Sequence, residues 1–195
     1  PHESSAASDV YKRQKELSEE LFRNDLRHLN TDSDSEVILN IFAHELQKIN
    51  SISPKADEIF LAVENMHKRL KGAYSIVLMI SGVGLLAIRD PNGIRPLIMG
   101  KKENDLLGKT DYMFSSESPA LDALDFEITG DLKPGEAVFV SLEGEMDRKV
   151  CHESPKHYPC IFEYVYLARP DAVIEEISVM KSRLRMGQKL GMKIK

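Results

Sequence analysis

The chain has 195 residues, of which 42% are hydrophobic and 29% are charged, with a formal net charge of −5 at pH 7. This length suits one sizeable domain, or one domain and the start of a second. The negative charge argues against nucleic acid as the main partner, and the lack of a bilayer-length apolar run argues against a membrane.

The first fourteen residues, PHESSAASDVYKRQ, are polar and aperiodic. We expect them to be a disordered or non-native leader outside the fold. From Lys15 onward, apolar residues recur at helical spacing, which predicts a first helix that ends near Asn30. The apolar positions of this helix are Leu17, Leu21, Leu26 and Leu29.

A second helix is expected to start within LNTDSDSEVILNIF, residues 29–42, and to continue past Leu46, with Glu45 and Lys48 on its outward face. Ser33 is the expected N-cap, and Glu36, three positions later, would complete a capping box. Asp34 is then a carboxylate that the helix start does not require. It either interacts with the helix dipole or binds a cationic ligand.

A third helix is expected to begin with Ser53 as its N-cap and Pro54 in its first turn, and to end just before Gly72. Three helices in one block, followed by several short strands, indicate an α+β fold in which helices cover a sheet. The expected strands cover residues 73–80, 83–89, 94–100, 112–116, 136–142 and 146–150.

Turn residues separate these strands and predict hairpins: SG at 81–82, DPNG at 90–93 and EG at 143–144. The strand at 73–80 is apolar on both faces, so we expect it to be central and covered on both sides. The visible helices form a single block. A second sheet, or sequence outside this chain, is therefore needed to complete the layers.

Two stretches invite a binding role. RDPNGIRPL carries Arg89 and Arg95 beside a glycine turn and could hold phosphate, but we favour a tight turn with Gly93 at positive φ. KSRLRMGQKLGMKIK, residues 181–195, carries six cations and no acid, and lies in a helix expected near 178–195. Charge runs of this kind are usually a solvated helix face.

Cys151, His152 and Cys160 form the only cluster of potential metal ligands, and four ligands are the norm for zinc. We therefore favour a Cys160 that is buried among the apolar residues after it. Two cysteines are too few for a disulfide framework and fit a reducing, cytoplasmic compartment.

Several stretches together closely resemble the glutamine phosphoribosylpyrophosphate amidotransferase family, over about residues 15–195. The resemblance is carried by RHLNTDSDSEVILNIFAHEL, GAYSIVLMI, RDPNGIRPLIMGKK, SSESPALDALDFE, LKPGEAVFV, PCIFEYVYLARPDAVIEEISV and RLRMGQKLGMKI. It implies a class II glutamine amidotransferase domain with the αββα sandwich of N-terminal-nucleophile hydrolases, partial here at 15–158. Residues 159–195 would then be the interdomain segment and the first helix of a phosphoribosyltransferase domain.

The resemblance implies that ammonia released from glutamine displaces pyrophosphate from phosphoribosylpyrophosphate, in the first committed step of purine synthesis. The glutamine-binding aspartate of the family falls on Asp34, which would pair with the α-ammonium group of glutamine. The family nucleophile is an N-terminal cysteine with its own amine as base. Pro1 can replace neither, and Cys151 and Cys160 have no free amine, so we expect this chain alone to be inactive.

The resemblance further implies Mg²⁺ in the missing transferase domain, a homo-oligomer, and purine nucleotides as feedback inhibitors. Some family members hold an iron-sulfur cluster. Cys160 is a weak candidate for one of its ligands, so the cluster stays undecided. The basic residues Arg183 and Arg185 would suit a site for polyphosphates.

Two alternatives remain at this point. One is another class II amidotransferase, such as a glucosamine-phosphate synthase or an asparagine synthetase. The other is a catalytically dead binding protein with the same sandwich, whose chain begins at PHESS. FEYVYLARPD argues against the first, and glutamine binding without hydrolysis would favour the second.

Overall fold

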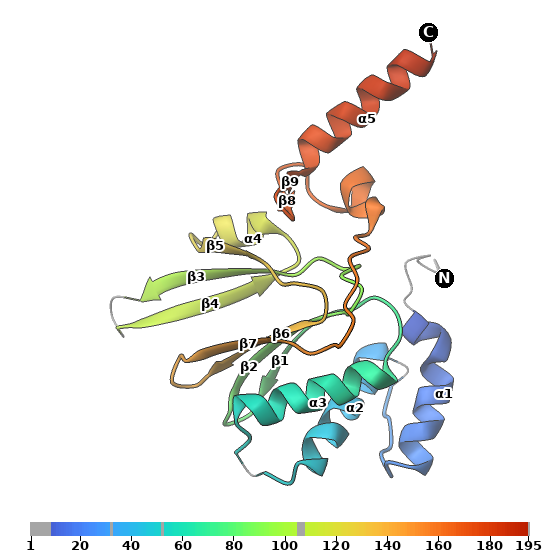
Figure 1. Cartoon of the computed structure of the whole chain (residues 1–195), viewed down its shortest axis with the longest axis vertical. Helices are drawn as coiled ribbons and strands as arrows, with labels where there is room; N and C mark the ends of the chain where they lie inside the picture. The colour runs from blue at the N-terminus through green and yellow to red at the C-terminus, as the bar shows by residue number, and fades with distance from the viewer. Residues whose placement is uncertain (1–8, 32, 52, 105–107, 195) are drawn as a thin grey trace.

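Four layers make up the sandwich in the computed structural model, which describes residues 9–31, 33–51, 53–104 and 108–194 and the side chains from Glu16 onward. Helices α1, α2 and α3 cover one side of a first sheet, a second sheet faces its other side, and the short helix α4 lies on the far side of the second sheet (Figure 1). The αββα order expected for the fold is therefore present.

The three covering helices are joined to the first sheet by one apolar core. Leu21, Ile41 and Val63 from the helices are fully buried in it, together with Leu86 and Ile88 from the sheet. Burying such side chains contributes about 1.5–3 kcal/mol each. The helices are α1 (Asp9–Arg23), α2 (Asp34–Lys48) and α3 (Ala56–Arg69).

Helix α1 begins and ends earlier than the sequence predicts. It starts at Asp9, so residues 9–14 are helical, and residues 1–8 of the expected leader lie outside the described part of the chain. It ends at Arg23 rather than near Asn30, because Leu26 adopts a left-handed φ of 54° and Arg27 donates its backbone N–H back to Leu21. A left-handed residue cannot continue a right-handed helix.

Helix α3 starts two residues later than expected. Lys55, not Ser53, is the N-cap residue, and Pro54 precedes the helix. The carboxylate of Glu58 accepts a hydrogen bond from the backbone N–H of Lys55 at 2.8 Å. This contact satisfies one of the backbone donors that a helix start leaves unpaired.

The first sheet, here called sheet A, has the antiparallel order β1-β2-β6-β7. The expectation that the first strand is central was wrong: β1 lies at an edge, and Val77 and Met79 on its second face are 47% and 78% exposed. The strands covered on both faces are β2 and β6. The strands of sheet A are β1 (Ser75–Ile80), β2 (Gly84–Arg89), β6 (Glu136–Ser141) and β7 (Met146–Val150).

The second sheet, sheet B, has the order β4-β3-β5 and packs on sheet A through Ala87, Val138, Leu97, Met99 and Leu132. The SG and EG turns form hairpins as predicted, but the DPNG turn does not. It carries the chain from β2 in sheet A to β3 in sheet B. Sheet B contains β3 (Ile98–Asn104), β4 (Lys109–Ser115) and β5 (Glu127–Asp131), with α4 (Ser118–Asp122) beside it.

The chain after the sandwich forms a π-helical turn, a two-stranded hairpin and a helix that extends away from the two sheets (Figure 1). The helix was expected, but the other elements were not, nor were α4 and β5. No described helix is long and apolar enough to cross a membrane. These elements are η1 (Glu163–Leu167), β8 (Val173–Ile174), β9 (Ile177–Ser178) and α5 (Val179–Ile194).

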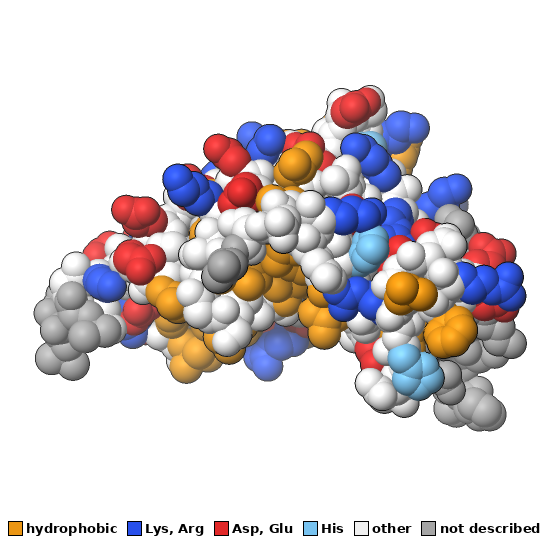
Figure 2. All heavy atoms as spheres, turned by 90° about the horizontal axis from the view of Figure 1, so that it is seen from below, with side chains coloured by type: hydrophobic (Ala, Val, Ile, Leu, Met, Phe, Trp, Pro, Cys, Tyr) orange, Lys and Arg blue, Asp and Glu red, His pale blue; other side chains and the backbone are white. Residues whose placement is uncertain are grey.

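The surface carries charges of both signs. Figure 2 shows acidic and basic side chains interspersed over the face seen from below, with hydrophobic side chains gathered near its middle. The face seen in Figure 2 therefore has no broad field of one sign with which to attract a polyanion.

Candidate functional site

A pocket of about 760 Å³ lies between the start of α2 and strand β1. Asp34 lines it from α2, and Val77 lines it from β1. Arg95 lines it from the β2–β3 connection, and Leu167 lines it from η1. Four segments that are distant in sequence therefore meet in this pocket, which is called the Asp34 pocket below.

Asp34 is the first residue of α2 and is half-buried. Its carboxylate accepts a long hydrogen bond, 3.5 Å, from the Ser35 hydroxyl. Among the residues that the structure describes, no lysine or arginine forms an ion pair with it. The carboxylate can therefore accept a cationic ligand in the pocket, and its position at a helix start favours its negative charge.

The expected capping box is absent. Ser33 is the N-cap residue, with φ −84° and ψ 132°, but its hydroxyl makes no capping hydrogen bond. Glu36 instead accepts from the backbone N–H groups of Asn30 and Thr31, each at 2.8 Å. These hydrogen bonds, led by that of Asn30, hold the pKa of Glu36 below its usual value and fix the loop that leads to Asp34.

Tyr74 also lines the Asp34 pocket, and a buried contact with His67 holds its side chain in place. Its phenolic oxygen lies 2.6 Å from Nδ1 of His67, and both residues are buried. Burial raises the pKa of Tyr74 above its usual value, so its hydroxyl stays protonated at neutral pH. This part of the pocket is therefore neutral.

Arg95 brings a positive charge to the same pocket. Its Nη1 lies 2.8 Å from Oε1 of Glu163, and the Glu163 side chain is only 6% exposed. Burial raises the pKa of Glu163, whereas the Arg95 charge opposes that shift. The ion pair links the pocket wall to η1.

The RDPNG segment forms a tight turn, as favoured from the sequence. Gly93 has a φ of 59°, and its N–H donates to the Asp90 carbonyl at 3.0 Å. The Asp90 carboxylate accepts from the N–H groups of Asn92, Ile94 and Arg95. The turn is therefore held by hydrogen bonds within the segment, most of them to the Asp90 side chain.

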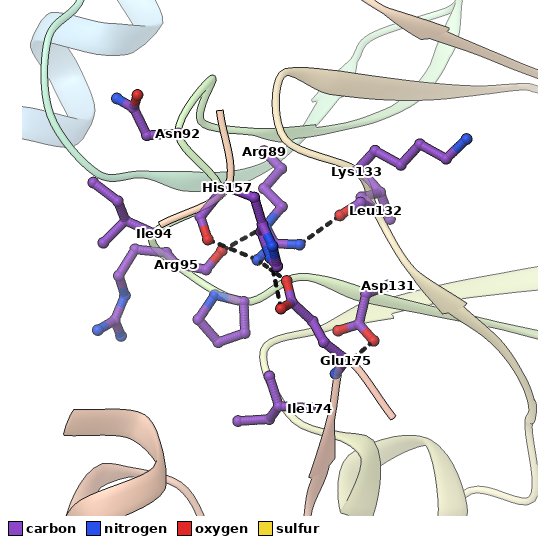
Figure 3. A network of polar contacts seen from close by, with 12 residues as sticks. Arg89, Asn92, Ile94, Arg95, Asp131, Leu132, Lys133, His157, Ile174 and Glu175 are labelled. Carbon is purple, nitrogen blue, oxygen red and sulfur yellow. Dashed lines mark hydrogen bonds and ion pairs between the residues drawn. The ribbon is translucent and has the colours of Figure 1, made fainter. Parts of the chain in front are cut away.

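Arg89 has a structural role in this segment and is not available for phosphate. It is 2% exposed, and it donates to the carbonyl oxygens of Gly93, Arg95 and Leu132 and to the Glu175 carboxylate (Figure 3). His157 reaches the other oxygen of Glu175 at 2.6 Å. Burial alone would raise the pKa of Glu175, but the hydrogen bonds from His157 and Arg89 outweigh it and lower that pKa.

The cysteines are not grouped with other potential metal ligands in the described part of the chain. No group of three or more histidine, cysteine or acidic side chains in the described part of the chain could hold a metal ion. Cys151 is buried, and burial raises its pKa to about 12. The expectation that Cys160 is buried was wrong, because it is partly exposed just before η1.

Comparison with known proteins agrees with this architecture. The profile of the family described as "Glutamine amidotransferase domain" matches residues 9–123. The chain belongs to this family. The match includes Asp34, β1, the β2–β3 connection and α4, and it ends before β5.

Homologous proteins extend the similarity further along the chain. The amidophosphoribosyltransferases of Pseudomonas aeruginosa and Escherichia coli are 50% and 49% identical to it over 179 residues, or 92% of this chain and 35% of each relative. That of Saccharomyces cerevisiae is 47% identical over 167 residues, or 84% of this chain and 32% of that relative. The chain thus spans about a third of the length of these curated relatives.

Solved structures support the fold. The glutamine phosphoribosylpyrophosphate amidotransferase from B. subtilis, complexed with ADP and GMP, superimposes with a TM-score of 0.68 at 28% identity, covering 86% of this chain and 33% of that one. A structure described as the allosteric regulatory enzyme of purine biosynthesis gives 0.74 at 27% identity, covering 93% and 35%. The N-terminal-nucleophile hydrolase fold is therefore confirmed.

The structure places Asp34 in a pocket. The residue pattern had marked it only as a surplus carboxylate, and the family resemblance had implied glutamine as its ligand. Sequence reasoning missed Tyr74, Arg95 and Leu167 as pocket residues. Arg95 stood in a stretch already singled out, RDPNGIRPL, but its contact with Glu163 is 68 positions away and left no local signal.

Proposed function

We propose that the complete protein is an amidophosphoribosyltransferase. It would release ammonia from glutamine and transfer it to phosphoribosylpyrophosphate, giving 5-phosphoribosylamine, glutamate and pyrophosphate. The observation that carries this proposal is the identity of about 50% over 92% of the chain with relatives of that name. The presence of Asp34 in a pocket of suitable size supports the glutamine half of the reaction.

In this proposal Asp34 binds the α-ammonium group of glutamine. A charge-assisted hydrogen bond to a carboxylate is roughly twice as strong as a neutral one. The hydrogen bonds of Glu36 to the preceding loop hold the start of α2 in place, so the carboxylate is positioned before the ligand arrives. Fixing the ammonium end of glutamine would direct its side-chain amide toward the nucleophile.

Neither cysteine of this chain suits the nucleophile of the reaction. Cys151 is buried as a thiol, and Cys160 lies within the chain and has no free amine to act as its base. We therefore also propose that the isolated 195-residue chain has no glutaminase activity.

Further properties of the complete protein belong to the same proposal. They are a division near residue 158 between the amidotransferase and transferase regions, Mg²⁺ in the transferase region, purine nucleotides as inhibitors, a homo-oligomeric state and a cytoplasmic location. An iron-sulfur cluster needs about four thiolates. Because Cys151 is buried in the core, three of them would have to come from outside this chain even if Cys160 were a ligand.

If the basic helix α5 binds polyphosphate, Arg185 is a better candidate for the contact than Arg183. Arg183 donates to the carbonyl oxygens of Tyr164 and Ala168, at 2.9 and 2.7 Å, and so stabilises the end of η1. Substituting Arg183 would disturb the fold, and a binding test of this helix should therefore substitute Arg185.

The test of the proposed function is Asp34→Asn in the complete protein. We expect the KM for glutamine to rise about 30- to 100-fold, the equivalent of roughly 2–3 kcal/mol. Ammonia-dependent synthesis should stay within about twofold of wild type. The matched control is Asp57→Asn, which makes the same change in the first turn of α3, outside the Asp34 pocket. Equal loss of both activities in Asp34→Asn would refute the assigned role.

A further inference from the structure

Two arginines, one at the end of β2 and one in the β2–β3 connection, pair with two glutamates from the chain beyond the sandwich. Arg95 contacts Glu163 at 2.8 Å, and Arg89 contacts Glu175 at 2.7 Å. Figure 3 shows both arginines, with the Arg89 guanidinium donating to the Arg95 carbonyl and to Glu175. Of the two, only Arg95 lies on the Asp34 pocket.

The wall of the pocket at Arg95 is built jointly with η1. Glu163 begins this π-helical turn and Leu167 ends it, and Leu167 lines the pocket beside Arg95. Two further contacts hold the same region: Cys160 donates its backbone N–H to the Ile94 carbonyl at 3.2 Å, and Ser75 donates to the Pro96 carbonyl at 3.0 Å. π-Helical turns of this kind are frequent at functional sites.

We propose that Glu163 is a positioning residue, which holds the Arg95 guanidinium against the wall of the Asp34 pocket and thereby sets the affinity of the pocket for the ammonium group of glutamine. This inference rests on the proposed function of Asp34. It adds a residue that lies outside the region matched by the family profile, residues 9–123.

The physical reason is the charge of Arg95. A guanidinium in the pocket repels an incoming ammonium group and competes with it for Asp34. Glu163 neutralises this charge from a buried position, where the attraction between opposite charges is screened less than at the surface. With the partner removed, the guanidinium can turn into the pocket.

The location of Glu163 gives the ion pair a second effect. Glu163 and Leu167 belong to the segment that leads from the sandwich to α5. A displacement of that segment therefore reaches the pocket wall directly, through one ion pair and one apolar side chain. The pocket is complete only when the segment is docked.

The experiment compares Glu163→Gln with Glu136→Gln in the complete protein. Glu136 is a close match because its side chain is 5% exposed and pairs at 2.7 Å with Arg148, which is 42% exposed; the corresponding exposures are 6% for Glu163 and 37% for Arg95. Neither Glu136 nor Arg148 lines the Asp34 pocket. Both variants should lower the thermal midpoint to a similar extent.

Only Glu163→Gln should raise the KM for glutamine, by about tenfold or more, while ammonia-dependent synthesis remains within about twofold. In an Arg95→Gln background, Glu163→Gln should change that KM by less than about twofold, because Glu163 acts through Arg95. An unchanged KM in Glu163→Gln, or an equal rise in Glu136→Gln, would overturn the proposal. The proposal would also be overturned if Glu163→Gln raised the KM for glutamine in the Arg95→Gln background as much as it does in the wild type.

If Glu163→Gln does not fold, Arg95→Lys provides the second variant, since Arg95 is partly exposed. It keeps the charge but loses the planar fork, and should raise the KM for glutamine at least about threefold. An unchanged KM would overturn the inference. Absence of glutaminase activity in the wild-type complete protein would instead refute the proposed function. If Asp34→Asn raises the KM for glutamine and neither Glu163→Gln nor Arg95→Lys does, the proposed function stands and the role of Glu163 is refuted.

Discussion

Nδ1 of His67 lies 2.6 Å from the phenolic oxygen of Tyr74, and this buried contact stands directly behind the Asp34 pocket. Burial, and to a smaller extent the nearby His152, lower the pKa of His67 from 6.5 to about 4. His67 is therefore neutral in the native protein at pH 7, and the packing behind the pocket depends on its remaining neutral.

The stability of the protein should therefore fall as the pH drops from 6.5 to about 4. In this range the unfolded chain binds a proton at His67 and the native chain does not, so acid favours unfolding, by roughly 3 kcal/mol across the window. The contribution is fully present above pH 6.5, and its loss levels off below about pH 4. The contribution of His67 can be measured by comparing the unfolding midpoints of wild type and His67→Gln as a function of pH. Parallel curves for the two proteins would contradict this prediction.

Removing Arg69 should destabilise the helical layer. Arg69 contacts Asp25 at 2.8 Å, Glu20 at 2.9 Å and Glu45 at 3.1 Å, and the side chains of Asp25 and Glu45 are only 8% and 5% exposed. Arg69→Met removes the cation that these two buried carboxylates share, although Lys48 stays 3.0 Å from Glu45 and His44 stays 3.2 Å from Asp25. The cost should therefore lie at the lower end of the about 3–5 kcal/mol that breaking a buried ion pair costs. Denaturant unfolding of the complete protein tests this.

The control for that experiment is Arg23→Met. Arg23 also pairs with a glutamate, Glu19, but the two side chains are 75% and 69% exposed. Exposed pairs contribute at most about 1 kcal/mol. Similar losses of unfolding free energy in Arg69→Met and Arg23→Met would show that burial of the carboxylates that pair with Arg69 has no energetic consequence.

The two cysteines should differ in reactivity with thiol reagents. Burial raises the pKa of Cys151 to about 12, and the thiolate is the reactive form. Cys160 is partly exposed. In the native protein at pH 8, iodoacetamide should modify Cys160 and leave Cys151 intact until the protein is unfolded; peptide mass mapping reads out both sites. Rapid native labelling of Cys151 would contradict its placement in the core.

Gly84→Ala should destabilise sheet A. A Cβ at this position would overlap the carbonyl oxygen of Val140 and lie 2.8 Å from the Phe139 ring. Overpacking of this kind costs about 1–3 kcal/mol or more. Gly191→Ala in α5 is the control, because its Cβ would meet nothing within 4 Å and alanine favours a helix by about 0.5–1 kcal/mol. A thermal midpoint unchanged by Gly84→Ala would count against the close packing of β2 and β6.

Local patterns predicted most of the elements but not how they pair. The 3.6-residue period placed α2 and the apolar runs placed β2 and β6, because these signals lie within a few residues of one another. The edge position of β1 was not predictable, because an apolar strand has the same sequence pattern whether one or two neighbouring strands pair with it in the sheet. Glu45 was predicted to face out, yet it is buried against Arg69, 24 positions later.

The same limit applies to the site. Asp34 could be singled out because a helix start has a limited use for carboxylates. Arg95 and Leu167 could not, since they reach the pocket through packing of the β2–β3 connection against η1. Resemblance to a known family named the ligand for Asp34, but the fold was needed to show which side chains surround it.

The edge position of β1 has a practical consequence for handling the protein. No described strand pairs with its outer edge, and Val77 and Met79 expose apolar surface beside that edge. Such an edge is a template onto which another chain can add a strand. Concentrated preparations of the 195-residue chain are therefore at risk of aggregating edge to edge, and Met79→Lys would oppose this pairing by placing a charge beside the edge.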